Sequence, residues 1–183
     1  LTHAHIDHAG GVSEIIGALG ESQGTRPQLL AHPKEKEMRQ SISRQALLYG
    51  LSPLEYRDVE EPDRYLEHGD TLEVGGVTGE VLFVPGHSPG HIALYFPSVC
   101  VGGGNPAEAE MRPVLIAGDT IFAGSIGRTD LPGGDTQTLL SSIKNHLLTL
   151  PDQTLVLSGH GPDTTIGRER VSNPFLVGMA EGE

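Results

Sequence analysis

Aromatic and basic side chains are scarce in this chain. Its 183 residues include no Trp, four Tyr and four Phe, so a surface on which nucleic-acid bases could stack is not expected. Twelve Lys and Arg stand against 24 Asp and Glu, which gives a net charge of −12. Without a basic run, such a field repels a polyanion. The composition therefore counts against a nucleic-acid partner.

Cysteine and long apolar runs are also nearly missing. Cys100 is the only cysteine, so an intramolecular disulfide and a zinc site built from several thiolates are both excluded. A reducing, cytoplasmic setting fits this best. No run of eighteen apolar residues occurs, and we therefore expect no membrane span.

The length and composition of the chain suit a small enzyme. The length favours one domain over residues 1–183, long enough for a substantial core. Hydrophobic residues make up 37 %, and 25 Gly and 13 Pro point to many loops. We find no internal repeat at a fixed period. These features favour a loop-rich α/β protein.

The first ten residues, LTHAHIDHAG, concentrate potential metal ligands. His3 and His5 are two apart, so in an extended segment both point to one side and can share an ion. Asp7 and His8 follow where the chain must leave the extended form, and the glycines at 10–11 allow it to turn. Imidazole and carboxylate together suit zinc, iron or manganese rather than calcium. The alternative is a solvated, His-rich terminus.

Three later segments favour the metal site over that alternative. They read VPGHSPGH at 84–91, LIAGDTIF at 115–122 and LVLSGHGP at 155–162. In each, a short apolar run leads to a His or Asp beside Gly. A strand can deliver a ligand from its end into a loop in this way.

Together these motifs resemble the metallo-β-lactamase superfamily, whose signature is His-x-His-x-Asp-His. The chain is most similar to the compact glyoxalase II-like, or hydroxyacylglutathione hydrolase-like, members. The resemblance runs from residue 2 to about 176 and is carried by 2–11, 85–91, 118–135 and 159–175. It implies an α/β fold, the αββα sandwich of two sheets with helices outside. Because family members enter the His motif from several strands, we expect an N-terminally truncated chain.

The resemblance also implies a binuclear metal centre. Two divalent ions are expected, zinc, with iron or manganese as alternatives. All seven expected ligand positions are filled by the expected residue type. The first ion would take His3, His5 and His87, the second would take Asp7, His8 and His160, and Asp119 would bridge both.

The implied activity is hydrolysis of a thioester, of the hydroxyacylglutathione type. A hydroxide bridging the ions, with its pKa lowered to about 7, is the expected nucleophile, and the cations polarise the attacked carbonyl. Asp7 would orient that oxygen or accept its proton. Asp119 would offset the repulsion between two dications. The expected partner is therefore a small-molecule thioester, and the oligomeric state is left open.

The loop at 124–134 bears on the substrate. In glyoxalase II a basic residue just after the bridging Asp holds the glutathione carboxylate, and Arg128 occupies that place. Arg128 could instead tie down its own loop through Asp130, which stands where glyoxalase II has Tyr. The helical domain that completes the glutathione site also lies outside this sequence. The exact acyl substrate is therefore left open.

Other activities remain as alternatives. An iron-dependent persulfide dioxygenase of the same superfamily shares the Gly-Arg-Thr-Asp string at 127–130 and would use His3, His87 and Asp119. The strings at 159–162 and 164–167 favour the hydrolase. A truncated domain that binds metal without activity is a third hypothesis, and a β-lactamase ranks below these.

Four histidines lie outside the expected ligand set. For His91, next to the His87 motif, we favour hydrogen bonding beside the ligands over metal ligation. His32 is expected to be a satisfied histidine at a strand end. His68 is expected in a solvated turn, and His146 on the exposed face of a helix.

The hydrophobic spacing predicts helices at 11–19, 33–49 and 135–150, the second ending at Gly50 and the third capped by Asp135.

Strands are expected between and after these helices, with a hairpin turn at 75–76. Residues 98–112 are expected to form a surface loop, either an inert insertion or a lid. The predicted strands are 28–31, 70–74, 77–84, 91–96, 114–117 and 154–157.

Overall fold

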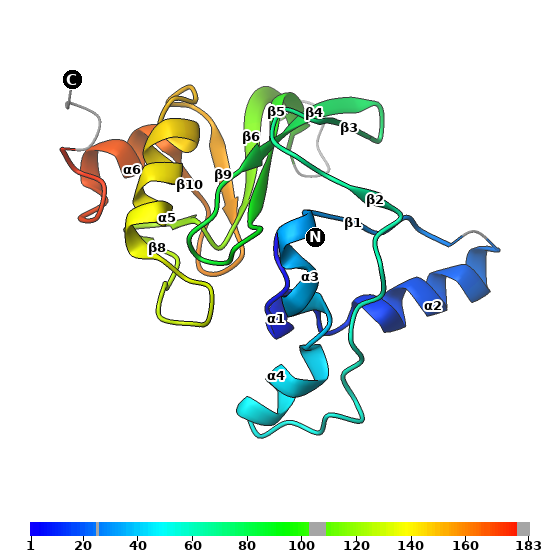
Figure 1. Cartoon of the computed structure of the whole chain (residues 1–183). Helices are drawn as coiled ribbons and strands as arrows, with labels where there is room; N and C mark the ends of the chain where they lie inside the picture. Colours follow the sequence, from blue (N-terminus) through cyan, green and yellow to red (C-terminus); the bar gives the residue numbers. More distant parts are fainter. Residues whose placement is uncertain (25, 103–108, 179–183) are drawn as a thin grey trace. The chain divides into compact units, whose positions relative to one another are not determined.

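The computed structural model describes residues 1–24, 26–102 and 109–178 (Figure 1). Contacts divide the chain into two compact units, Leu1–Leu66 and Glu67–Glu183, which are described separately below. That the whole chain forms one domain stays a prediction.

The first unit is mainly helical. Among its described residues, 1–24 and 26–66, the one strand pair is short and parallel, with Leu30 opposite Arg64 and Ala31 opposite Tyr65. In chain order, its elements are α1 (Ile6–Ala9), α2 (Val12–Gln23), β1 (Leu30–Ala31), η1 (Pro33–Glu35), α3 (Lys36–Arg39), α4 (Ile42–Leu48) and β2 (Arg64–Tyr65).

The helix predicted at 11–19 is present as α2 and continues to Gln23, where Gly24 ends it at a φ of 66°. The continuous helix predicted at 33–49 is wrong. It is divided into η1, α3 and α4, because Ser41 leaves the helical backbone at φ −132° and ψ 19°. Its N–H and its hydroxyl both bond to the carbonyl of Met38, a local alternative to helical hydrogen bonding.

A small apolar core and one buried cation hold the first unit together. The guanidinium of Arg39 is fully buried and donates to the carbonyls of Val59 and Glu60. It thereby fixes the irregular segment after α4 to the end of α3. The buried apolar side chains are Ala4, Ala9, Ile16, Leu29, Ile42 and Val59.

The second unit is built on a six-stranded sheet with the order β10-β9-β6-β5-β4-β3. All neighbours are antiparallel except β6 and β9, which run parallel. The strands are β3 (Thr71–Val74), β4 (Val77–Phe83), β5 (Ile92–Val101), β6 (Glu110–Gly118), β9 (Leu155–Ser158) and β10 (Thr164–Thr165).

The hairpin between β3 and β4 is confirmed. Gly75 and Gly76 both take positive φ, 59° and 81°, which a two-residue turn of this kind requires. The loop predicted at 98–112 is wrong at both ends, since Val99 pairs with Arg112 and the ladder continues outward. The middle of the predicted loop, 103–108, lies outside the described residues, so whether the loop is an inert insertion or a lid stays a prediction.

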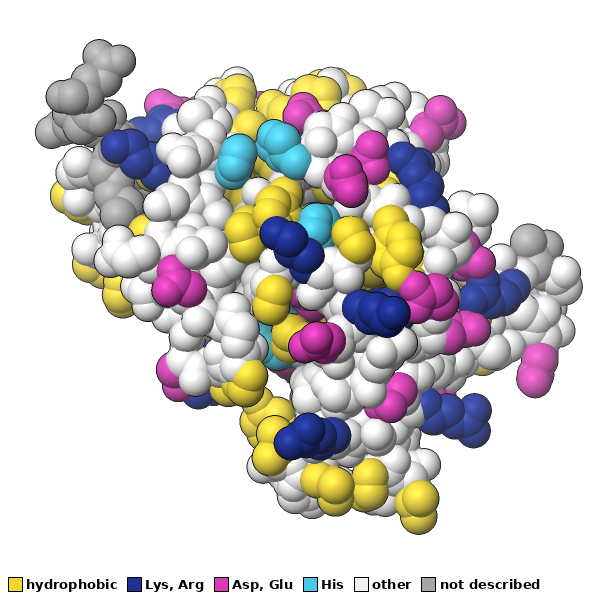
Figure 2. Space-filling model, viewed as in Figure 1, with side chains coloured by type: hydrophobic (Ala, Val, Ile, Leu, Met, Phe, Trp, Pro, Cys, Tyr) yellow, Lys and Arg dark blue, Asp and Glu magenta, His cyan; other side chains and the backbone are white. Residues whose placement is uncertain are grey.

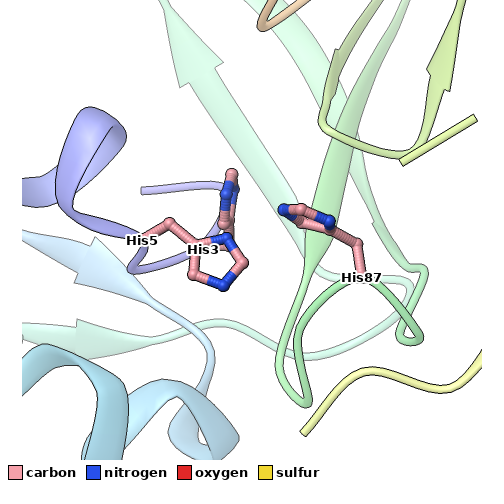
Figure 3. Close-up of side chains that lie close together, drawn as sticks. All are labelled: His3, His5 and His87. Carbon is pink, nitrogen blue, oxygen red and sulfur yellow. The ribbon is translucent and has the colours of Figure 1, made fainter. Parts of the chain in front are cut away.

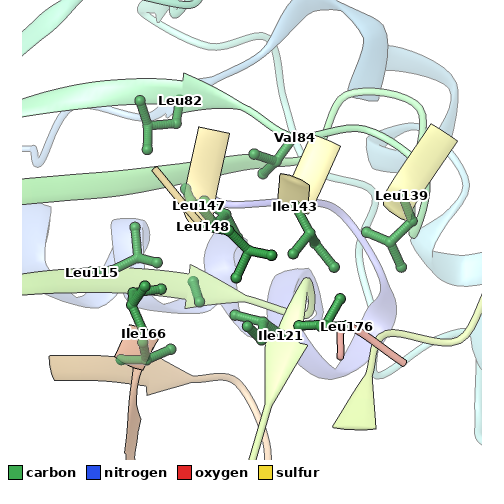
Figure 4. Packing of buried hydrophobic residues seen from close by; sticks show 13 residues of the cluster. Leu82, Val84, Leu115, Ile121, Leu139, Ile143, Leu147, Leu148, Ile166 and Leu176 are labelled. Carbon is green, nitrogen blue, oxygen red and sulfur yellow. The ribbon is translucent and has the colours of Figure 1, made fainter. Parts of the chain in front are cut away.

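Helices cover one face of this sheet and form the main core (Figure 4). Asp135 caps α5 (Thr136–Ser142) as predicted, because its Oδ1 accepts the N–H of Thr138 at 2.7 Å. The chain then continues as a π-helical turn, η3 (Ile143–Leu147). After β10 it forms a further helix, α6 (Ile166–Ser172). Burying one such Leu or Ile contributes about 1.5–3 kcal/mol. The core side chains include Leu82, Val84, Leu115, Ile121, Leu139, Ile143, Leu147, Ile166 and Leu176.

The α/β class predicted from the sequence is confirmed by this mixture of a multi-stranded sheet and helices. On the face drawn in Figure 2, Lys and Arg lie interspersed with Asp and Glu. Within the described part of the chain, no helix combines the length and the apolar character that crossing a membrane requires.

Candidate metal centre

The N-terminal motif changes from extended chain to helix at its second histidine. His5 has an extended backbone, φ −69° and ψ 151°, and stands at the N-cap of α1. Its carbonyl accepts the N–H of His8 at 3.0 Å and that of Ala9 at 2.8 Å. Asp7 and His8 therefore lie in the first helical turn, as the sequence predicts for the point where the chain leaves the extended form.

This turn gathers the side chains of the motif. The rings of His3 and His5 meet edge to face with centroids 4.9 Å apart, and His8 lies 4.1 Å from His3. The rings of His3 and His5 are buried, whereas the Asp7 side chain is 51 % exposed. Asp7 Oδ2 lies 3.6 Å from His8 Nε2. All four predicted ligands of the first unit thus form one cluster, of which Figure 3 draws His3 and His5.

The two glycines after this motif do not provide the freedom to turn that the sequence predicted for them. Gly10 and Gly11 have φ of −63° and −97°, which other residues adopt equally well. At Gly10 the requirement is space: a Cβ would lie 2.5 Å from the carbonyl oxygen of Ile6 and 3.0 Å from the ring of Tyr56. Close packing under α1, rather than freedom to turn, explains the glycine at position 10.

Two side chains that sequence reasoning missed bind the backbone of the motif. Glu35 accepts the N–H of Ala4 at 2.7 Å. Gln45 accepts the N–H of Ile6 at 3.0 Å and donates to the carbonyl of Ala4 at 3.1 Å. Their contacts span 31 to 41 positions, so no local pattern distinguishes them from other polar residues of a helix.

His87 lies in the loop after β4 and is oriented by a distant carbonyl. Its Nδ1 is 2.8 Å from the backbone oxygen of Arg128. Because a carbonyl can only accept, this nitrogen carries the proton and Nε2 is left as the electron-pair donor. Metal-binding histidines are commonly held in this way by their second nitrogen.

The approach of that carbonyl depends on Gly127. A Cβ there would lie 1.9 Å from the backbone oxygen of Asp119 and 3.2 Å from Nδ1 of His87. The absence of a side chain lets the 124–134 loop pack against both predicted ligands.

Sheet topology brings Asp119 and His160 together. They follow β6 and β9, parallel neighbours in which Gly118 pairs with Ser158, so both strands end at the same edge. Oδ2 of Asp119 lies 3.4 Å from Nε2 of His160 and 3.6 Å from Nε2 of His87. The side chains of Asp119 and His87 are buried, whereas that of His160 is 57 % exposed. One carboxylate oxygen thus faces two imidazoles.

His91 occupies the position predicted for a residue that supports ligands. Its ring is fully buried, and its Nε2 accepts the N–H of Asp119 at 3.0 Å. The interaction fixes the backbone at the point where Asp119 leaves β6.

The three remaining histidines contact residues outside the predicted ligand set. Nδ1 of His32 accepts the N–H of Lys34 at 3.2 Å, which agrees with a satisfied histidine at a strand end. His68 is exposed and lies 4.7 Å from His146, ring to ring. His146 is half-buried rather than exposed, because it packs against that ring. Burial lowers the pKa of His146, and the neighbouring His68 lowers it further.

Arg128 uses its side chain within its own loop. Its Nε donates to Oδ1 of Asp130 at 2.7 Å and its Nη2 donates to Oδ2 at 2.8 Å. This bidentate pair lowers the pKa of Asp130 to about 2. Both side chains are largely exposed, and this pair is the contact that the loop-anchor alternative predicted for Arg128.

A second group missed from the sequence supports this loop. The fully buried carboxylate of Glu169 accepts from the N–H of Gly124, the hydroxyl of Thr164 and the amide of Asn173. Asn173 also donates to the carbonyl of Ser125 at 2.9 Å. These bonds tie α6 to the short hairpin of β7 (Ile121–Phe122) and β8 (Ser125–Ile126), which leads into the 124–134 loop.

The donor set fits a transition metal. Ligands about 2.05 Å from a tetrahedral ion lie about 3.3 Å from one another, close to the separations around Asp119. Neutral imidazoles with carboxylate suit zinc or iron better than calcium, which takes oxygen ligands. Within the first unit, the predicted ligands His3, His5, Asp7 and His8 lie together. Within the second unit, His87, Asp119 and His160 do so.

Known proteins are similar to this chain in sequence and fold. The chain is 39 % identical over 178 residues to hydroxyacylglutathione hydrolase GloC of Haemophilus influenzae, covering 96 % of this chain and 74 % of that protein. It is 39 % identical to TTHA1623, whose structure is in a di-iron-bound form, with a TM-score of 0.75 over 96 % of this chain and 75 % of that one. The BLEG-1 B3 metallo-beta-lactamase is 38 % identical, with a TM-score of 0.76 over 97 % and 76 %.

A family model covers most of the sequence and includes every predicted ligand. It matches residues 1–99 and 108–160, from the N-terminal His cluster to the histidine that follows β9. With the fold and these relatives, the match establishes that the chain belongs to the metallo-beta-lactamase superfamily.

Proposed function

We propose that this chain is a metal-dependent hydrolase that cleaves thioesters of the hydroxyacylglutathione class. The observation that carries the proposal is the Asp119 carboxylate, whose Oδ2 faces Nε2 of both His87 and His160 at 3.6 and 3.4 Å. Membership of the superfamily and the similarity to a hydroxyacylglutathione hydrolase support it.

In this proposal two ligand groups each hold one divalent transition-metal ion, zinc or iron. Such ions lower the pKa of bound water and polarise a carbonyl. As the resemblance implies, one ion would take His3, His5 and His87, the other would take Asp7, His8 and His160, and Asp119 would be shared by both.

The side chains around these groups have distinct roles. With metal bound, the charge of Asp119 would offset the repulsion between two dications. His91 and the carbonyl of Arg128 hold Asp119 and His87 in place. Asp7 is half exposed, so its carboxylate is accessible to orient an attacking water and accept its proton. His160 is similarly exposed and would face the substrate.

The substrate class rests on Arg128. A glutathione thioester carries carboxylates, and a guanidinium binds a carboxylate bidentately. Arg128 already makes such a pair with Asp130, so a substrate carboxylate has to replace that partner. Binding would therefore be an exchange of one carboxylate for another on an exposed cation.

The test is metal content of the purified protein measured together with hydrolysis of S-lactoylglutathione. About two ions per chain with turnover are expected, and Asp119→Ala should lose both metal and turnover. Glu73→Gln, which removes an exposed carboxylate from β3, is the control and should behave like the wild type. Stoichiometric metal without thioester turnover would contradict the proposed activity.

Two further activities are assayed on the same preparation. The similarity to a B3 metallo-beta-lactamase calls for hydrolysis of a chromogenic β-lactam. The Gly-Arg-Thr-Asp string at 127–130 calls for oxygen uptake with glutathione persulfide, which would use one iron on His3, His87 and Asp119. One iron, oxygen uptake and no thioester cleavage would establish the dioxygenase instead. Metal binding with no activity in all three assays would favour the inactive metal-binding domain.

A further inference from the structure

The backbone of the N-terminal motif is held by side chains from other elements. Ala4 and Ile6 alternate with the ligand residues His3, His5 and Asp7, so their peptide groups determine how those ligands are presented. We propose that Glu35 and Gln45 are positioning residues that set the geometry of this motif for metal binding. The inference rests on the proposed function.

The contacts form one set around three consecutive peptide groups. Glu35 accepts the N–H of Ala4 at 2.7 Å, while Gln45 donates to the carbonyl of the same residue at 3.1 Å. Gln45 also accepts the N–H of Ile6 at 3.0 Å. Gln45, from α4, therefore holds both peptide groups that flank His5, and Glu35, from η1, holds the preceding peptide group between His3 and Ala4.

These side chains supply the backbone hydrogen bonds that a neighbouring strand would supply in a sheet. Residues 1–5 belong to no helix or strand of the described structure, although Ala4 is fully buried. Buried peptide groups need hydrogen-bond partners, and an unmet one costs about 1–3 kcal/mol. Glu35 and Gln45 supply these bonds individually, so the ligand geometry depends on two replaceable residues.

Both residues are themselves held firmly. Glu35 is only 1 % exposed, and a carboxylate accepting a backbone N–H makes a stronger bond than a neutral acceptor. The amide of Gln45 also donates to the carbonyl of Met38 at 3.2 Å. Because its oxygen and its nitrogen are both engaged, the amide has one orientation. A fixed amide and a buried carboxylate suit a positioning role.

The expected effect is on affinity for metal. Replacing residues that orient metal ligands commonly weakens binding by about 10–100-fold. We therefore expect Gln45→Leu to weaken zinc binding by at least about tenfold, and Glu35→Gln, which keeps the acceptor and loses the charge, by less. The matched controls are Gln40→Leu and Glu37→Gln, which change exposed residues of the same segment.

The experiment combines three measurements. Zinc affinity comes from competition with a chelator, and the visible spectrum of the cobalt-substituted protein reports ligand geometry. Amide hydrogen exchange of the metal-free protein, measured by NMR, reports the hydrogen bonds of Ala4 and Ile6. In Gln45→Leu these two amides should exchange faster, whereas the β4 amide of Val81 should stay as protected as in the wild type.

The outcomes separate this inference from the proposed function. Wild-type protein that binds no metal would refute the proposed function, and the exchange data would still decide the positioning role. Unchanged exchange at Ala4 and Ile6, or unchanged zinc affinity and cobalt spectrum, would overturn the inference. If Gln45→Leu does not fold, Gln45→Glu replaces it, since that variant keeps the acceptor for Ile6 and loses the donor to Ala4.

Discussion

Replacement of Asp130 by Asn tests the proposal that Arg128 binds a carboxylate of the substrate. The change keeps the shape of residue 130 and removes the negative charge that now pairs with the guanidinium. The guanidinium of Arg128 then has a weaker partner at residue 130. A substrate carboxylate can therefore replace that partner more easily. We expect KM for S-lactoylglutathione to fall while kcat is unchanged.

The size of the effect follows from exposure. The side chains of Arg128 and Asp130 are 57 % and 69 % exposed, so water screens their attraction despite the two short hydrogen bonds. Exposed pairs of this kind change an equilibrium by up to about fivefold. The predicted decrease in KM is therefore about two- to fivefold.

The effect should be constant across neutral pH. The pKa of Asp130 is lowered from 3.8 to about 2 by Arg128, so its carboxylate stays ionised throughout the range of an ordinary assay. A lowered folded-state pKa means that the pair stabilises the fold above about pH 4. That contribution is lost as the pH falls toward 2.

The assay compares two substrates on three proteins. S-lactoylglutathione carries carboxylates and a small neutral thioester does not, so Asp130→Asn should lower KM only for the first. Arg128→Ala should raise KM for the first more than for the second. Equal changes on both substrates, or no change in either variant, would refute carboxylate binding by Arg128 and leave it as a loop anchor.

The remaining predictions concern the metal ligands, the loop and the core. Asp119→Ala should leave less than half of the wild-type metal content and remove most turnover; near-normal rates would contradict a two-metal mechanism. Gly127→Ala should melt at lower temperature and bind metal more weakly, because its Cβ would lie 1.9 Å from the backbone oxygen of Asp119. Leu147→Ala should lower the free energy of unfolding by about 2–5 kcal/mol in urea, since Leu147 is fully buried. Added zinc should raise the melting temperature of the wild type, and a chelator should reverse this.

The ligand types and several elements could be predicted because their signals are local. The spacing of His3, His5, Asp7 and His8 lies within six positions, and the turn after His5 forms where the chain was expected to leave the extended form. The Gly75 and Gly76 hairpin follows equally from neighbouring residues.

The residues that hold the site could not be predicted because their partners are far away in sequence. Glu35 and Gln45 contact residues 31 and 39 positions distant, and Glu169 bonds to Gly124 across 45. The extension of β5 and β6 into the predicted loop has a similar cause, since it depends on pairing between two strands, such as Val99 with Arg112, which a local pattern does not show. The break before α4 depends on a serine that bonds locally.

The contact between His87 and Arg128 separates the positioning of a predicted metal ligand from substrate recognition. These two properties often change together in enzymes. The imidazole is held by the peptide oxygen of residue 128, which every amino acid possesses, while substrate recognition would use the side chain. Substitutions at 128 can therefore alter which acids are accepted and still leave the histidine with its partner. Position 128 is thus a site where specificity can diverge among relatives without rebuilding the metal centre, provided that residue 127 remains glycine.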